Sequence, residues 1–264
     1  MRTVILAAGL AGLSVTGLAG TASAAPLEAG EWSGAFTAGI ERPVNGDVHG
    51  GAVAAVPNLG PLNPALAGVS AELRIVSRSY EDIYEDATTY GLELTRGIGG
   101  NREVFGALRR VEADEGSVQV GGAFVPALST TLPVFGRFGE YKATNFEAGL
   151  RQYFGEGAFK PYVAGRAGLA RVDGINATFT IPAANIAIPN ARFYDDSTVA
   201  ILGADVGVSY ALTDRFSLAA ETGLRWHSSL KDDDSSIAGL GLASINDEGD
   251  RLSVPVSVRA TVKF

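Results

Sequence analysis

The sequence predicts an all-β fold, an eight-stranded antiparallel up-and-down transmembrane β-barrel, on the basis of three observations. Apolar and polar residues alternate through eight segments, each about 10–15 residues long, which is the length that a tilted membrane strand needs. The connections between the segments are alternately short and long. Beyond residue 24, no stretch approaches the 18 or more apolar residues of a membrane helix.

The last segment, residues 251–264, shows the alternation most clearly. Leu252 and every second residue up to Phe264 are apolar, whereas the residues between them are polar or proline. This period of two predicts a strand with one apolar and one polar face. A strand with a long apolar edge must pair with another strand, so we expect it to close a barrel by pairing with the first.

The other segments and their connections complete the plan. The remaining seven segments are residues 31–41, 88–97, 102–113, 143–154, 160–172, 198–212 and 215–228. The short connections, residues 98–101, 155–159 and 213–214, have the length of hairpin turns. The long ones are residues 42–87, 114–142, 173–197 and 229–250. Short periplasmic turns and long extracellular loops are the plan of an outer-membrane barrel. Residues 71–77 could form an extra strand or rim structure, and we expect no internal repeat beyond the hairpins.

The N-terminal 24 residues have the features of a signal peptide. A basic Arg2 precedes a small and apolar run, and Ala22-Ser23-Ala24 forms a cleavage pattern. We therefore expect export, with one barrel domain over residues 25–264. The formal net charge of −8 gives no support to nucleic-acid binding. The absence of cysteine excludes disulfides and cysteine-bound metals.

Large aromatic residues lie at the ends of the segments, with aliphatic residues between them. The aromatic residues at the turn ends are Trp32, Phe154, Tyr210, Phe216 and Phe264, and those at the loop ends are Tyr90, Phe146 and Trp226. Two aromatic girdles around an aliphatic band fit a bilayer with two interfaces. A soluble barrel or sandwich, the alternative, places its large aromatics in the core.

The opposite faces carry a balanced set of charges. The four acids and four bases are Glu93, Glu147, Asp205, Glu221, Arg151, Arg166, Arg225 and Arg259. Buried charges are costly unless they are paired, so we predict an ion-pair network that plugs the barrel interior. An ordinary solvated face is the alternative. In residues 102–113, Arg109 and Arg110 cannot both point inward.

The chain resembles the outer-membrane protein A-like, porin-like eight-stranded barrels of Gram-negative bacteria. The resemblance rests on the terminal VSVRATVKF, on KPYVAGRAGLARV and on TRGIGGNREVFGALRR. It implies an outer-membrane location, a plugged interior and an assembly signal at Phe264 that the outer-membrane assembly machinery reads. The aromatic residue common two positions before the end is Val262 here. Many members carry a peptidoglycan-binding domain after the barrel, and we expect none because the sequence ends at Phe264.

Other motifs give weaker signals. His49 lies in a glycine-rich loop and is expected to be solvated. His227 and Ser229 have the His-x-Ser spacing of eight-stranded lipid A deacylases, with Glu248 as a candidate acid. The alternation turns His227 inward, however, whereas an enzyme that acts on lipid needs this residue at the membrane. Residues 231–235 lack the ligand spacing of a calcium loop and are expected to form a solvated tip. No catalytic residue, metal site or cofactor is predicted.

Function follows from the filled barrel. Eight strands leave an interior just wide enough for side chains, which indicates a structural or porin-like protein with at most a narrow passive pore. The expected partners are outer-membrane lipids and lipopolysaccharide and the assembly machinery, and we expect a monomer. One alternative is a surface binding or adhesion protein that holds an unknown ligand through its long loops. A lipid A-modifying enzyme is the other alternative.

Overall fold

The computed structural model describes residues 26–264, so the predicted signal peptide lies outside the described residues. Eight strands close into a barrel in the order β1-β16-β15-β14-β11-β10-β7-β6. They are β1 (Trp32–Asn45), β6 (Ala87–Gly99), β7 (Arg102–Ala113), β10 (Tyr141–Tyr153), β11 (Phe159–Val172), β14 (Ser197–Ala211), β15 (Phe216–His227) and β16 (Arg251–Lys263). Neighbouring strands are all antiparallel, which confirms the predicted fold class.

The first and last barrel strands form the closing pair, as predicted. Ser33 of β1 lies opposite Lys263 of β16, and Ile40 lies opposite Val256. At the end of the barrel where Ser33 and Lys263 lie, β6 and β7 are joined by a tight turn. In this turn Gly99, Gly100 and Asn101 have positive φ angles of 80°, 63° and 58°. Glycine and asparagine tolerate this left-handed backbone, which explains their use in the turn.

Side chains alternate between the two faces of the barrel wall. On β10, Arg151 is fully buried inside, whereas Phe146 is 59% exposed on the outside. On β7, Arg109 is buried and Arg110, on the opposite face, is partly exposed, so one of the two arginines points inward. The apolar face of every barrel strand therefore forms the outer wall.

Aromatic residues border the outer wall. The exposed aromatic residues at the turn end include Trp32, Phe154, Phe159, Tyr210 and Phe264, and those at the opposite end include Tyr90 and Phe146. Phe159 was placed in a turn by the sequence, but it begins β11 and its ring lies 4.5 Å from that of Tyr210. Phe216 and Trp226 are only partly exposed. Exposed leucine and valine side chains occupy most of the wall between these girdles.

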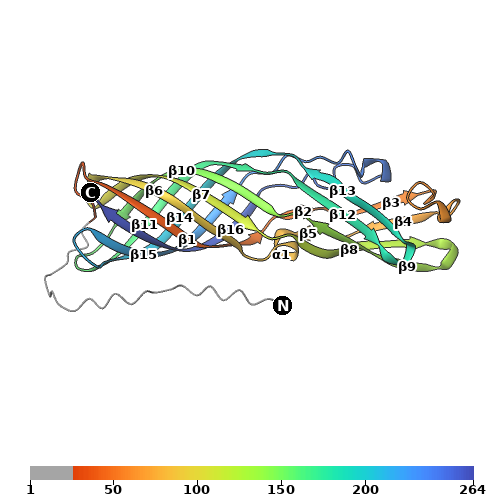
Figure 1. Ribbon diagram of the computed structural model, residues 1–264, viewed down its shortest axis with the longest axis horizontal. Helices are drawn as coiled ribbons and strands as arrows, with labels where there is room; N and C mark the ends of the chain where they lie inside the picture. Colours follow the sequence, from red (N-terminus) through yellow and green to blue (C-terminus); the bar gives the residue numbers. More distant parts are fainter. Residues whose placement is uncertain (1–25) are drawn as a thin grey trace.

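The long connections contain regular β-structure that their composition did not indicate. Six strands, β3 (Ala52–Val56), β4 (Ala71–Ile75), β8 (Gly116–Val125), β9 (Thr130–Phe138), β12 (Ile175–Ile181) and β13 (Ile186–Tyr194), form a sheet in the order β13-β12-β9-β8-β4-β3. The suggested strand at residues 71–77 is β4. The sheet prolongs the molecule beyond the barrel, opposite the short turns (Figure 1). We call residues 46–86, 115–140, 174–196 and 228–250 the extension.

The fourth long connection closes the open side of this sheet. The sheet ends at β13 and β3, and residues 228–250 contact the segments at both ends. Tyr194 of β13 pairs with Asp232, and the backbone N–H of Gly50, just before β3, donates to the carbonyl of Ile245 over 2.7 Å. Residues 231–235 are solvated as expected, since Lys231, Asp232 and Ser235 are exposed, but they do not form a free tip because the segment is hydrogen-bonded to β13. The segment continues into a short 3-10 helix, η4 (Ala238–Leu240).

Three hairpin ends of the extension share a short sequence. This recurrence is an exception to the expectation that the chain has no internal repeat beyond the hairpins. The three ends are the 3-10 turns η1 (Pro64–Leu66), η2 (Pro126–Leu128) and η3 (Pro182–Ala184), which read Pro-Ala-Leu twice and Pro-Ala-Ala once. Proline fixes the φ angle at the first position of the turn and has no N–H that would lack a partner there. A repeat of three residues, 62 and then 56 positions apart (126 − 64 and 182 − 126), gives no periodic signal along the chain.

The polarity of the inside and outside reverses between the barrel and the extension. The barrel is charged inside and apolar outside. In the extension, Val134 and Phe138 of β9 face inward and are buried, whereas Arg137 between them is exposed. The same reversal occurs on β13, where Phe193 is buried and Arg192 is exposed. The extension therefore has the surface of a protein in water, and the barrel has the surface of a protein in lipid.

Candidate functional site

The charged barrel interior is built by the inward faces of all eight barrel strands. All eight residues predicted for the network are buried, and each forms at least one ion pair. They gather into two clusters that share no salt bridge, one near the short turns and one nearer the extension.

The cluster near the turns is centred on Arg151. Its guanidinium donates to Glu93 over 2.9 Å and to Glu103 over 3.1 Å. Arg259 from the closing strand donates to the same Glu93 over 2.7 Å. The Arg151 guanidinium also lies 4.7 Å from the ring centre of Phe105. This cluster joins β6, β7, β10 and β16 across the barrel.

The second cluster is centred on Arg166. Its Nε donates to Asp205 over 2.8 Å and its Nη1 donates to Glu147 over 3.0 Å. Arg225 donates to the other oxygen of Asp205 over 2.6 Å. Glu221 accepts from Tyr162, Arg109, Ser257 and Arg166 over 2.7, 3.2, 3.2 and 3.5 Å. Every acid of the cluster therefore has at least one arginine partner.

The interior holds more charges than the sequence indicated. Within residues 26–264, six acids and six basic residues are buried in the barrel: Glu41, Glu93, Glu103, Glu147, Asp205, Glu221, Arg109, Arg151, Lys160, Arg166, Arg225 and Arg259. Glu103 and Arg109 were missed because the faces of β7 were ambiguous, and Glu41 because β1 was expected to end there. Thr37 on β1 and Phe105 on β7 face inward, and the three missed residues lie at even spacings from them. Continuing the period of two from Thr37 and Phe105 would therefore have identified Glu41, Glu103 and Arg109 as interior residues.

The N-terminal residues of the described chain cover the turn end of the interior. Leu27 is buried, and its backbone N–H donates to Glu103 over 3.1 Å. A β-carbon on Gly97 would lie 2.1 Å from the carbonyl oxygen of Glu28, so this glycine permits the close approach. The hollow left between Leu27, Arg151 and Arg259 has a volume of about 50 Å³.

His227 lies inside the barrel and contacts an acid that the sequence did not indicate. Its Nε2 is 3.2 Å from Oε1 of Glu41, and Ser253 donates to the same oxygen over 2.7 Å. The carboxylate therefore lies between the histidine and this serine, whereas an activated serine needs the histidine next to it. Ser229 is exposed and lies two residues beyond the end of β15.

Aromatic residues separate the charged interior from the extension. The Arg251 guanidinium lies 4.2 Å from the ring centre of Tyr141 and 5.1 Å from that of Tyr80, and it donates to the Tyr141 hydroxyl. Tyr80 begins the short helix α1 (Tyr80–Ile83), which Ser79 and Asp82 cap reciprocally. Tyr84 donates to the carbonyl of Gly139 over 3.0 Å. These rings form a lid between the two compartments.

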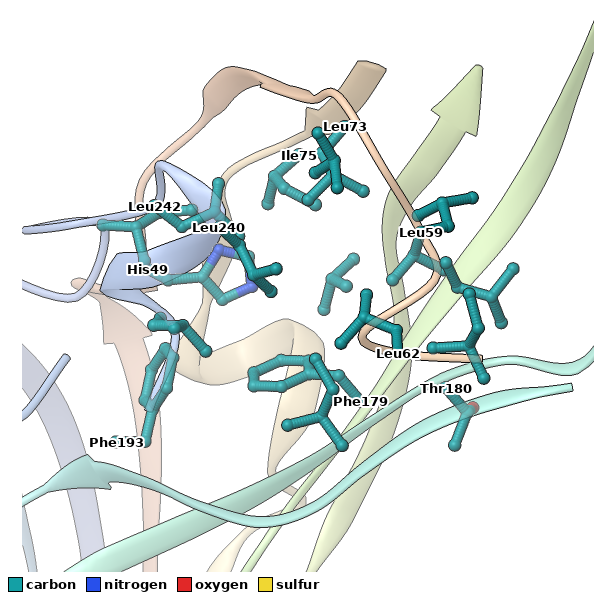
Figure 2. Close-up of a pocket in the computed structure, with 18 residues that line it drawn as sticks. His49, Leu59, Leu62, Leu73, Ile75, Phe179, Thr180, Phe193, Leu240 and Leu242 are labelled. Atoms are coloured by element: carbon teal, nitrogen blue, oxygen red, sulfur yellow. The ribbon is translucent and has the colours of Figure 1, made fainter. Parts of the chain in front are cut away.

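The interior of the extension is apolar, and His49 lies within it. His49 ends β2 (Asp47–His49), which pairs with β5 (Arg78–Ser79). The expectation that it is solvated is wrong, because only 2% of its surface is exposed. Its ring stacks on Phe138 with 5.9 Å between ring centres, and Nδ1 lies 3.0 Å from the carbonyl oxygen of Gly50. Figure 2 shows His49 among apolar side chains of the extension, near Phe193 and Leu242. The glycines beside it suggested a loop, whereas residues distant in sequence, among them Phe138, Phe193 and Ile245, bury it.

Burial gives His49 a pH-dependent effect on stability. Loss of solvation lowers the pKa of its imidazole, outweighing the hydrogen bond to Gly50 that raises it; Arg78 lowers the pKa further, and Asp47 and Asp82 raise it slightly. The unfolded extension therefore binds a proton more readily, and stability falls as the pH drops below about 6.5. At pH 5 we expect a loss of at most about 2 kcal/mol.

Hydrogen exchange of the β12 and β13 amides at pH 7 and pH 5, corrected for the intrinsic rates, measures this loss. The matched control is His49→Phe, which retains a ring and removes the titration. An equal acid sensitivity in both proteins would show that another group is responsible.

Among residues 26–264, no group of three or more His, Cys, Asp or Glu side chains is placed to hold a metal ion.

Comparison with known proteins gives only distant similarities. No family model and no curated protein sequence matches this chain. Neisserial surface protein A is 17% identical, with a TM-score of 0.41 over 89% of this chain and 98% of that chain. The outer-membrane protease OmpT from Escherichia coli is 9% identical, with a TM-score of 0.43 over 89% and 97% of the two chains. Similarities of this degree do not assign a family, so the resemblance to outer-membrane protein A-like barrels stays a prediction. The class of the protein follows from its own topology, a closed eight-stranded antiparallel barrel with a filled, charged interior.

Proposed function

We propose that the protein is an integral barrel of the Gram-negative outer membrane, in which a filled membrane segment anchors the extension at the cell surface. The observation that carries this proposal is the reversal of polarity. An apolar outer wall bordered by aromatic residues suits lipid, and the polar outside of the extension suits water. Among residues 26–264, no helix combines the length and apolar composition that a membrane-spanning helix requires.

The barrel interior supports a structural role with at most a narrow passive pore. The paired charges and Leu27 occupy the path along the axis, and eight strands leave little space besides. Its contacts with the membrane are those of an anchor, with lipids and lipopolysaccharide around the wall. Phe264, exposed at the turn end, serves as the assembly signal, and we propose a monomer.

A catalytic role has weaker support. A lipid A-modifying enzyme would need His227 beside Ser229 at the membrane, whereas the ring is sealed inside with Glu41. A binding role at the cell surface is favoured by a separate feature of the extension, argued below.

The membrane-facing wall predicts the effect of one substitution. Val206→Arg places a charge midway along β14 on the outer face, and we expect it to destabilise the folded barrel by about 2–4 kcal/mol. Urea unfolding in lipid vesicles, followed by heat-dependent gel mobility, measures the loss. The matched control is Val53→Arg on the exposed side of β3, where we expect almost no change. Equal effects of the two arginines would contradict the membrane assignment.

The filled interior predicts the electrical behaviour of the barrel. In planar bilayers we expect the wild-type protein to show no stable open state, because Glu93 is held both by Arg259 and by Arg151 from the opposite wall. Arg259→Ala removes one plug residue and should give brief, small openings. Arg137→Ala, which changes an exposed ion pair of the extension, is the control and should behave as wild type. A stable open pore in the wild type would overturn the plugged-barrel proposal.

A further inference from the structure

The extension contains an apolar hollow that the anchoring role does not use. It lies between the inner face of the sheet and residues 237–245 (Figure 2). Its cavity has a volume of about 60 Å³, and with its mouth and the part open to solvent it measures about 690 Å³. Leucine, isoleucine, valine and phenylalanine side chains line it, and the polar lining residues are His49 and Thr180. Ligand pockets in proteins share this character, a largely apolar wall with few polar groups.

His49 gives the hollow a defined hydrogen-bonding group. Because Nδ1 lies 3.0 Å from the carbonyl oxygen of Gly50, which accepts, Nδ1 carries the proton. Nε2 is then an acceptor, and it is buried without a hydrogen-bond partner among residues 26–264. Buried polar atoms are nearly always paired, so an orphaned acceptor beside a hollow calls for a donor. The lowered pKa of His49 keeps the ring neutral at pH 7, which excludes recognition through a fixed positive charge.

We propose that this hollow binds a molecule with an unbranched alkyl chain and a hydroxyl group, the hydroxyl donating to Nε2 of His49. The enclosed volume is well below the ~150 Å³ of a cavity that holds benzene, so a narrow chain fits better than a ring. The rest of the chain extends into the part of the hollow that is open to solvent. The chain can belong to a free alcohol or to a hydroxylated acyl chain of a lipid, because both present the same chemistry.

Magnetic resonance on the full mature chain in lipid nanodiscs tests the proposal. The probes are 1-octanol and octane, and the signals are ¹⁵Nε2 of His49 and the methyl groups of Ile188 and Ile237. We expect octanol to shift both kinds of signal and octane to shift only the methyl groups. A hydrogen bond of ordinary strength gives octanol roughly a tenfold higher affinity than octane. A third arm uses nanodiscs that contain a lipid with a hydroxylated acyl chain and no octanol.

Three variants make the outcomes specific. Leu240→Trp places a larger side chain in the lining of the hollow and should abolish the shifts, whereas Val53→Trp, on the exposed side of β3, should leave them unchanged. His49→Phe should lower the affinity for octanol by about tenfold or more, because the hydroxyl loses its acceptor, and should leave the affinity for octane unchanged. Heat-dependent mobility verifies that each variant retains its barrel, so a failure of binding is distinguishable from a failure of the anchoring role. The proposal is overturned if neither octanol nor the hydroxylated lipid shifts both signals, or if the shifts persist in Leu240→Trp.

Discussion

Arg151→Ala is expected to destabilise the barrel by about 3–5 kcal/mol, as the loss of one partner from a buried ion pair does. The arginine is fully buried and holds both Glu93 and Glu103, so its removal leaves Glu103 with no basic partner among residues 26–264. Glu93 keeps Arg259. Urea unfolding in lipid vesicles, with tryptophan fluorescence as the signal, measures the change.

Two controls separate the ion pair from general damage to the barrel. Arg137→Ala removes an exposed arginine that pairs with Glu115, and surface pairs contribute about 0–1 kcal/mol. The double variant Arg151→Met with Glu103→Gln removes both the arginine and the charge that it leaves unpaired, so it should recover part of the loss. If Arg151→Ala were no more harmful than Arg137→Ala, the interior network would not hold the barrel together.

Phe138→Ala should remove about 3–5 kcal/mol from the extension while the barrel stays intact. Phe138 is fully buried, and its ring lies 5.3 Å from Phe193, 5.9 Å from His49 and 6.0 Å from Phe179. Deleting the ring therefore removes the centre of the aromatic packing in the extension, beyond the lid that Tyr80 and Tyr141 form.

Limited proteolysis of the protein in vesicles measures this effect, because the extension is then accessible to protease. We expect faster cleavage within β8, β9, β12 and β13 and unchanged heat-dependent mobility of the protected barrel. Phe135→Ala, on the outer side of the same strand, is the matched control and should be cleaved as slowly as wild type. Loss of the barrel together with the extension would show that the two compartments fold as one unit.

The barrel could be predicted from sequence because two environments act on every one of its strands. Lipid requires Phe146 and Leu150 outside, while the crowded interior requires Glu147 and Arg151 between them, so period two persists for the whole strand. The charged interior followed from the same pattern wherever its phase was clear. On β7 the adjacent Arg109 and Arg110 made it unclear which residues face inward, so Glu103 was not identified as an interior charge.

The extension could not be predicted in the same way. Its strands are shorter than those of the barrel, and their apolar residues point in the direction opposite to those of the barrel. His49 shows the difficulty best: glycines follow it, and its burial depends on Ile245 and Phe138, which are distant in sequence. Contacts of this kind leave no periodic trace near the residue that they bury.

The pairing of β1 with β16 also determines the order in which the molecule can be built. Ser33 and Lys263, opposite each other at this junction, are separated by 230 positions (263 − 33), so the wall cannot be completed before the last strand has been synthesised. Joining ends so far apart in the chain is slow. The hairpins β8–β9 and β12–β13, by contrast, pair locally, but they lie on the side of the barrel away from the turns. If the turns remain in the periplasm, these hairpins must cross the membrane as unpacked segments. The aromatic packing around Phe138 is then expected to form after the hairpins have crossed.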